Sequence, residues 1–137
     1  MDSERSFTVK LSVNVGPVRT LESFIMYRIG NSKENEFFVD HQNMAALHAY
    51  AYKMQNGVTR MVAIHGLIKV NGMNVFQMNI GPEDADVNGY VVLQIGKVFA
   101  LMQITEDPPN GSLMQPSYYS FEEKMDDLLH IWGDFDL

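Results

Sequence analysis

Apolar and polar residues alternate most regularly near the N-terminus, over residues 7–15. The odd positions are apolar from Phe7 to Val15, and the residues between them are polar. A period of two is typical of a β-strand with one buried face. Gly16-Pro17 follows and interrupts regular structure. We therefore expect the chain to open with an amphipathic strand.

Two helices are predicted next, over residues 20–30 and 40–55. Thr20 is the expected N-cap of the first, and Gly30 its stop. Asp40 is the expected N-cap of the second, which Asn56-Gly57 ends. Apolar residues at helical spacing support both predictions: Leu21, Phe24, Ile25 and Ile29 in the first, and Met44, Leu47, Ala51 and Met54 in the second.

The middle of the chain, residues 59–105, is predicted to be β structure. Residues 59–70 and 73–80 flank Asn71-Gly72, which is a strong hairpin signal. The first of these strands is apolar on both faces, so we expect a central strand covered on both sides. Residues 90–105 are extended again. Gly96-Lys97 within them predicts either a tight hairpin turn, which we favour, or a bulge in one long bent strand.

The last part of the chain carries its net charge. The whole chain has a formal charge of −7, and residues 1–105 hold equal numbers of acidic and basic side chains. Residues 106–119 contain three prolines and form the expected tether. Residues 120–137 are predicted to be an acidic amphipathic helix, capped by Ser120 and Glu123 and stopped by Gly133, followed by a short tail.

The expected fold is therefore a single α+β domain over residues 1–137, in the order β-α-α-β-β-β-β-α. An antiparallel sheet of about five strands would carry the helices on one face. This order of elements is similar to that of the helix-grip folds, such as the START and Bet v 1 type domains. The resemblance implies a cavity between the sheet and the helices that would hold an apolar ligand.

Composition narrows the function classes. The absence of cysteine removes disulfides, thiol nucleophiles and sulfur-ligated metals, and it suits a reducing, cytoplasmic compartment. The scattered basic residues argue against nucleic-acid binding. No apolar run reaches the roughly 18 residues of a membrane span, so no integral membrane association is expected.

Motifs for chemistry are sparse. The carboxylate and amide side chains of Asp84, Asp86 and Asn88 resemble the first half of an EF-hand calcium loop. However, Ile95 stands where the bidentate glutamate belongs, so we expect an inter-strand loop and no metal. No nucleophile, phosphate loop or zinc motif is present, and we expect neither an enzyme nor a cofactor. Four residues are candidates for an apolar pocket: Phe37, Tyr50, Tyr52 and His65.

The function that these observations favour is a non-catalytic protein-interaction or scaffolding module that self-associates. Ten methionines and the acidic C-terminal segment motivate it, because both are typical of contact surfaces. The expected partner-binding residues are those of the apolar stripe and tail: Met125, Leu128, Leu129, Trp132, Phe135 and Leu137. The alternatives are a binder of small apolar molecules or a small cavity enzyme of helix-grip-like architecture.

A third alternative rests on a short resemblance. Residues 6–13, together with Pro17-Val18-Arg19-Thr20, resemble the opening strand and turn of vesiculovirus-type rhabdoviral matrix proteins. That resemblance implies a viral structural protein that assembles with copies of itself. It covers about a tenth of the chain, and no site residues are transferred from it.

Overall fold

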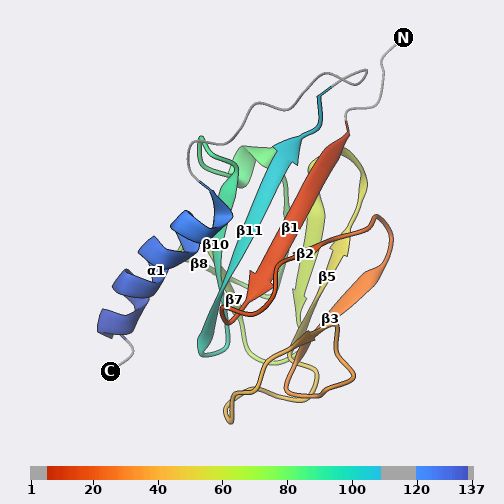
Figure 1. Cartoon of the computed structure of the whole chain (residues 1–137). Helices are drawn as coiled ribbons and strands as arrows, with labels where there is room; N and C mark the ends of the chain where they lie inside the picture. Colours follow the sequence, from red (N-terminus) through yellow and green to blue (C-terminus); the bar gives the residue numbers. More distant parts are fainter. Residues whose placement is uncertain (1–5, 109–119, 136–137) are drawn as a thin grey trace. The chain divides into compact units, whose positions relative to one another are not determined.

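The computed structural model describes residues 6–108 and 120–135, the side chains of 131–135 excepted. The chain forms two compact units, Met1–Asp107 and Pro108–Leu137. The first unit consists of two β-sheets that face each other as the layers of a sandwich (Figure 1). The second contains one helix. Each unit is described by itself.

The first sheet has six strands in the order β2-β1-β11-β10-β7-β8. Strands β1 and β11 pair antiparallel over seven residues, from Phe7↔Glu106 to Val13↔Ala100. The bounds are β1 (Phe7–Val13), β2 (Arg19–Thr20), β7 (Ile68–Val70), β8 (Met73–Val75), β10 (Tyr90–Ile95) and β11 (Val98–Glu106).

The second sheet has five strands in the order β4-β3-β5-β6-β9. Its neighbours are antiparallel except β3 and β4, which run parallel. The bounds are β3 (Met26–Gly30), β4 (Phe37–Phe38), β5 (Ala49–Lys53), β6 (Thr59–Ala63) and β9 (Gln77–Ile80). Two single 3₁₀ turns, η1 (Gln55–Gly57) and η2 (Pro82–Asp84), complete this unit.

The core lies between the sheets and is built by alternation along the strands, as in other sandwiches. The expected alternation of the opening strand is confirmed from Phe7 to Leu11, because Val9 and Leu11 are fully buried and Lys10 is exposed. It is wrong beyond that point, since Ser12 is buried, the strand ends at Val13, and Val15 is exposed in the turn that follows. In the second sheet Tyr27 and Ile29 point inward, as do Ala49 and Ala51 of the neighbouring strand.

The predictions of a helix over residues 20–30 and of another over residues 40–55 are both wrong. The predicted α+β fold class, which depended on those helices, is therefore wrong as well. Residues 20–30 form the end of β2, an isolated bridge at Ser23, and β3, while residues 40–48 form a loop that leads into β5. The apolar pattern over residues 49–54 is compatible with both a helix and a strand. Ala51 and Met54 have helical spacing, whereas Ala49-Tyr50-Ala51-Tyr52 alternates as a strand does. These residues form strand β5 because they hydrogen-bond to β3 on one side and to β6 on the other.

The single central strand predicted over residues 59–70 is also wrong. Residues 64–67 leave the second sheet, so that β6 belongs to one layer and β7 to the other. The predicted hairpins are confirmed. Asn71-Gly72 joins β7 to β8 with positive φ at both residues, and Gly96-Lys97 joins β10 to β11.

The second unit contains α1 (Phe121–Phe135). The predicted capping box is confirmed, because Glu123 N–H donates to Ser120 Oγ (3.1 Å) and Ser120 N–H donates to Glu123 Oε1 (3.0 Å). The predicted stop at Gly133 is wrong, since the helix continues to Phe135. Within the described residues no helix is long and apolar enough to cross a membrane.

Candidate functional site

The loops that follow β1, β3, β4, β6 and β10 lie at one end of the sandwich, the loop end. His48, in the loop after β4, links that loop to strand β3 and to the loop after β6. Ala45 N–H donates to His48 Nδ1 (3.0 Å), and His48 N–H donates to Ile29 O (2.8 Å). The His48 carbonyl accepts from the backbone N–H groups of Ile64 and His65. Because Nδ1 accepts, the ring proton sits on Nε2. This side chain holds the loop end in one arrangement.

Burial lowers the pKa of His48, and the neighbouring His65 ring, whose centroid is 5.9 Å away, lowers it further. Its unfolded-state pKa is about 6.5, so below that pH the unfolded chain binds a proton that the folded chain does not. We expect the free energy of unfolding to fall as the pH falls through 6.5 and to be fully recovered above it. Urea unfolding at pH 7.5 and 5.5 measures this.

The matched control is His48→Asn, whose Oδ1 takes the place of the ring Nδ1 and can still accept from Ala45 N–H. This variant is expected to lose the part of the pH dependence that lies near 6.5 and to keep the part below pH 5 that comes from carboxylates. An identical pH dependence in both proteins would contradict the assignment to His48.

Glu36 accepts hydrogen bonds from two arginines, Arg28 and Arg19, near this end of the sandwich. Its Oε1 accepts from Arg28 Nε (3.1 Å) and from the Arg28 backbone N–H (2.8 Å), and its Oε2 accepts from Arg28 Nη2 (3.0 Å). The hydrogen bond from the Arg28 side chain lowers the pKa of Glu36 to about 2. The Glu36 backbone carbonyl also accepts from Arg19 Nη1 (2.8 Å). Arg28 is thus bound to an internal carboxylate.

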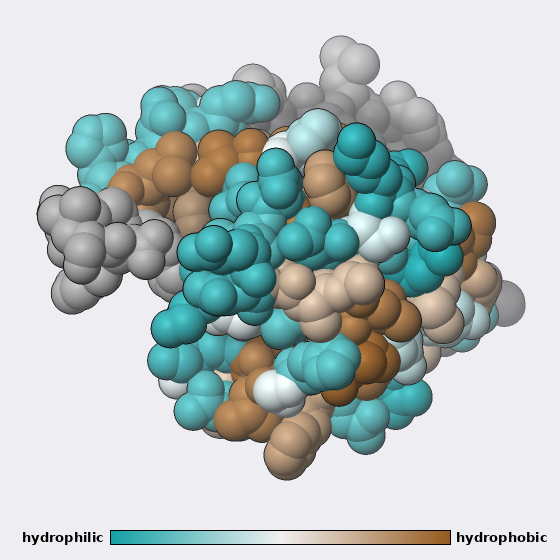
Figure 2. Space-filling model, turned by 90° about the horizontal axis from the view of Figure 1, so that it is seen from below, coloured by the Kyte–Doolittle hydropathy of each residue, from teal (hydrophilic) through white to brown (hydrophobic). Residues whose placement is uncertain are grey.

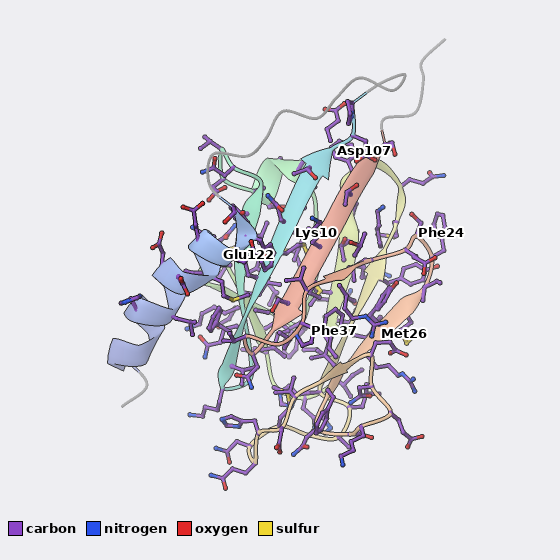
Figure 3. The ribbon with its side chains drawn as sticks, in the orientation of Figure 1. Lys10, Phe24, Met26, Phe37, Asp107 and Glu122 are labelled. Atoms are coloured by element: carbon purple, nitrogen blue, oxygen red, sulfur yellow. The ribbon has the colours of Figure 1, made fainter. Side chains whose placement is uncertain are left out.

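The outer surface of the second sheet is aromatic. We use the name "aromatic face" for four residues: Phe24, Met26, Tyr50 and Tyr52. Met26 lies opposite Tyr52 in the pairing of β3 with β5, and the Phe24 ring meets the Tyr52 ring edge-on at 6.2 Å. Phe24 is 55% exposed and Met26 is 50% exposed. Figure 3 shows both on the β3 side of the sandwich, pointing away from the core.

Phe24 is held in a conformation that a bulky residue seldom adopts. Its φ is +64°, in the left-handed region, which costs a non-glycine residue about 1–2 kcal/mol. The hydrogen bond from Phe24 N–H to Lys53 O (2.8 Å) fixes this geometry. Backbone strain that fixes an exposed ring is a reason to look for a function at that ring.

The structure does not bring the four predicted pocket residues into one cavity. Phe37 is buried, with its ring 6.1 Å from that of Tyr27. Tyr50 and Tyr52 lie on the aromatic face, and His65 lies at the loop end against His48. The expectation rested on a helix over residues 40–55, which would have placed the tyrosines differently.

The acidic loop after η2 bonds to its own backbone. Asp84 Oδ2 accepts from Gly81 N–H, and Asp86 Oδ1 accepts from the N–H groups of Asn88 and Tyr90, all at 2.9 Å. Within residues 6–108 and 120–130, no three His, Asp or Glu side chains converge as a metal site would require. The carboxylates of this loop act as turn caps.

The partner-binding residues predicted on the C-terminal segment stay a prediction. Met125, Leu128 and Leu129 lie on α1. The side chains of Trp132 and Phe135, and Leu137 as a whole, lie outside the described residues. Sequence reasoning missed Phe24, Met26 and Glu36 as site residues. The alternation of side chains in Met26-Tyr27-Arg28-Ile29 is compatible with a strand, and a strand prediction there would have placed Met26 on an outer face of the sheet.

Comparisons with known structures agree on this architecture. The FHA domain of a Chlamydia trachomatis protein is 16% identical, with a TM-score of 0.57 over 74% of this chain and 99% of that one. The FHA domain of an Arabidopsis thaliana hypothetical protein is 13% identical, with a TM-score of 0.58 over 82% of this chain and 98% of that one. An FHA domain studied for phosphothreonine-dependent interactions is 16% identical, with a TM-score of 0.53 over 74% of this chain and 98% of that one.

These solved structures support the fold as a β-sandwich. No curated protein matches the sequence. The sequence of residues 10–104, however, matches the family described as the Mutator 2 Fork head associated domain. Fork head associated (FHA) domains are non-enzymatic protein-interaction modules that recognise phosphorylated peptides. The match confirms the expectation of a non-catalytic interaction module and spans more than half of the chain, which therefore belongs to the Mutator 2 Fork head associated domain family.

Proposed function

We propose that this chain is a protein-interaction domain that self-associates through its aromatic face. The observation that carries the proposal is Phe24, an exposed ring held at a positive φ beside Met26 and Tyr52. Phenylalanine, tyrosine and methionine are enriched at protein interfaces, and adjacent exposed apolar side chains on a soluble domain often mark one.

The ion pair of Arg28 with Glu36 is compatible with a second copy as the partner. Arg28 lies opposite Tyr50, in the middle of the pairing of β3 with β5, and its charge is neutralised by Glu36. Two copies that meet through the same surface therefore avoid like-charge repulsion at Arg28. Arg60, opposite Tyr52 on β6, is exposed and can stack over a tyrosine ring of the other copy.

Sedimentation equilibrium of the full chain over a range of concentrations tests this proposal. We expect a monomer–dimer equilibrium that shows little dependence on salt, because the surface is mostly apolar. A monomer at every concentration up to about 1 mM would overturn it, since even an interface much smaller than the standard size gives detectable association there.

Phosphopeptide recognition is the second candidate, and family membership favours it. The FHA family uses arginine clusters for phosphate, whereas the Arg28 guanidinium is here bound to the Glu36 carboxylate. Arg19 donates through Nη1 to the neutral Glu36 carbonyl and keeps its positive charge. Exposed lysines at the loop end, Lys33 and Lys97, are the remaining cations there among the described residues. Titration with phosphothreonine peptides and their unphosphorylated twins separates the two functions, and strong phosphate-dependent binding would favour this second candidate.

A further inference from the structure

A groove of about 420 Å³ opens between the turn after β1 and strand β4. Val13, Pro17, Phe37 and Phe38 form its apolar walls, and Arg19 and Glu36 line it as well. Its volume falls in the range of ligand pockets, roughly 300–1,000 Å³. Figure 2, viewed from the loop end, shows apolar surface in patches among hydrophilic side chains.

Arg19 gives this groove a positive charge that no carboxylate neutralises in the described part of the chain. Its guanidinium stacks over the rings of Tyr27 and Phe37, at 5.8 and 5.9 Å, and donates through Nη1 to the Glu36 carbonyl. The Glu36 carboxylate is held by Arg28 instead. The aromatic stacking fixes the plane of the guanidinium, and its other N–H groups remain available to an anion.

The turn that borders the groove is strained. Asn14 and Val15 have φ of +55° and +58°, and Gly16 N–H donates to Val13 O (3.0 Å), as in a type I′ turn. Asparagine suits this conformation, but a β-branched valine does not. Val15 is nevertheless 46% exposed. Val18, three residues further along the chain, and Phe38, on the opposite wall of the groove, are both 42% exposed. Strain that places apolar side chains in solvent indicates a contact surface.

We propose that this groove binds an acidic linear segment of a partner protein, in which a phenylalanine or leucine stands next to an aspartate or glutamate. The apolar side chain would enter between Pro17 and Phe38, and the carboxylate would accept from Arg19 in a charge-assisted pair. The unneutralised arginine selects an acidic segment, and the apolar walls select its large side chain. Residues 134–137 of this chain, Asp-Phe-Asp-Leu, have this chemistry, which makes them a suitable probe.

The test is a fluorescence-anisotropy titration of the full chain with a labelled, C-terminally amidated peptide of residues 130–137. We expect a micromolar Kd that weakens about tenfold or more in Arg19→Gln, because one charged hydrogen-bonding partner is lost. Lys69→Gln, which removes an exposed charge from β7, is the matched control and should leave the Kd unchanged. No binding at 1 mM, or equal affinity for the wild type and Arg19→Gln, would overturn the proposal.

A second variant separates binding from folding. Phe38→Ser removes an apolar wall of the groove at a side chain that is 42% exposed, so its melting temperature should stay close to that of the wild type while its affinity for the peptide falls. A variant that is equally stable and binds equally well would show that Phe38 makes no contact with the peptide, and would count against the proposed site. Phosphorylated peptides that bind more tightly than the acidic probe, in a manner dependent on Arg19, would replace this proposal with a phosphate site.

This inference stands apart from self-association. A Phe24→Asn variant that no longer dimerises is expected to bind the acidic peptide as the wild type does. Loss of peptide binding in Arg19→Gln is likewise expected to leave unchanged the association that depends on Phe24. Each proposal can therefore fail without the other.

Discussion

Gly30→Ala is expected to destabilise the sandwich by about 3–5 kcal/mol. A Cβ at this position would collide with the Ala46 carbonyl oxygen and would lie 2.7 Å from that of Ala45. Ordinary contacts of a Cβ begin near 3.4 Å. The backbone of the loop before β5 would therefore have to move away from β3.

That movement is costly because both carbonyls are already in use. The Ala45 carbonyl accepts from Asn31 N–H (2.8 Å), and the Ala46 carbonyl accepts from Asn35 Nδ2 (2.6 Å). Overpacking costs about 1–3 kcal/mol and each broken hydrogen bond about 0.5–1.5 kcal/mol, so the sum is a large part of the stability of a domain.

Gly72→Ala is the control. Nothing lies within 4 Å of its added Cβ, but φ is +86°, so the expected loss is only about 1–2 kcal/mol. Urea unfolding measures both variants. A Gly30→Ala protein within 1 kcal/mol of the wild type would show that the loop is not packed against β3 as described.

Phe24→Asn is expected to abolish self-association while the domain stays folded. Large aromatic residues at the centre of an interface contribute about 2 kcal/mol or more, which is a loss of about thirtyfold in the association constant. Met26→Lys should act in the same direction, because it places a charge on the aromatic face.

The effect of Phe24→Asn on folding is the difference between two small contributions. Asparagine tolerates a φ of +64°, so strain of about 1–2 kcal/mol is relieved. The edge-on contact with Tyr52, worth about 0.5–1.5 kcal/mol, is lost. The free energy of unfolding should therefore stay within about 1 kcal/mol of the wild type.

Phe76→Ser is the matched control for association. Phe76 is 72% exposed but lies between β8 and β9, outside the aromatic face. Sedimentation of the three variants should show dimer loss for Phe24→Asn and Met26→Lys and an unchanged dimer for Phe76→Ser. Equal loss in all three would indicate nonspecific hydrophobic association.

Local signals predicted the parts of this fold that local chemistry determines. The alternation over β1, the Asn71-Gly72 and Gly96-Lys97 turns and the Ser120–Glu123 capping box depend on neighbours within a few residues, and all are present. Gly133 was misread because a helix can tolerate a glycine in its last turn, at a cost of about 1 kcal/mol.

Pairing between distant segments decided the rest. Residues 49–53 fit both a helix and a strand, and only their position between β3 and β6 selects the strand. The candidate site also depends on contacts between residues that are not neighbours in the sequence. The contact of Glu36 with Arg28 was not visible in the order of residues. That Phe24 faces solvent and not the core depends on a left-handed backbone turn at a residue that rarely makes one.

The most direct test of self-association through the aromatic face is single-cysteine cross-linking, because the native chain contains no cysteine. Met26→Cys and Phe76→Cys proteins are treated with a short bismaleimide at a concentration where the wild type is dimeric. We predict a cross-linked dimer for Met26→Cys and only monomer for Phe76→Cys. Equal cross-linking of the two, or dimer from Phe76→Cys alone, would contradict association through the aromatic face.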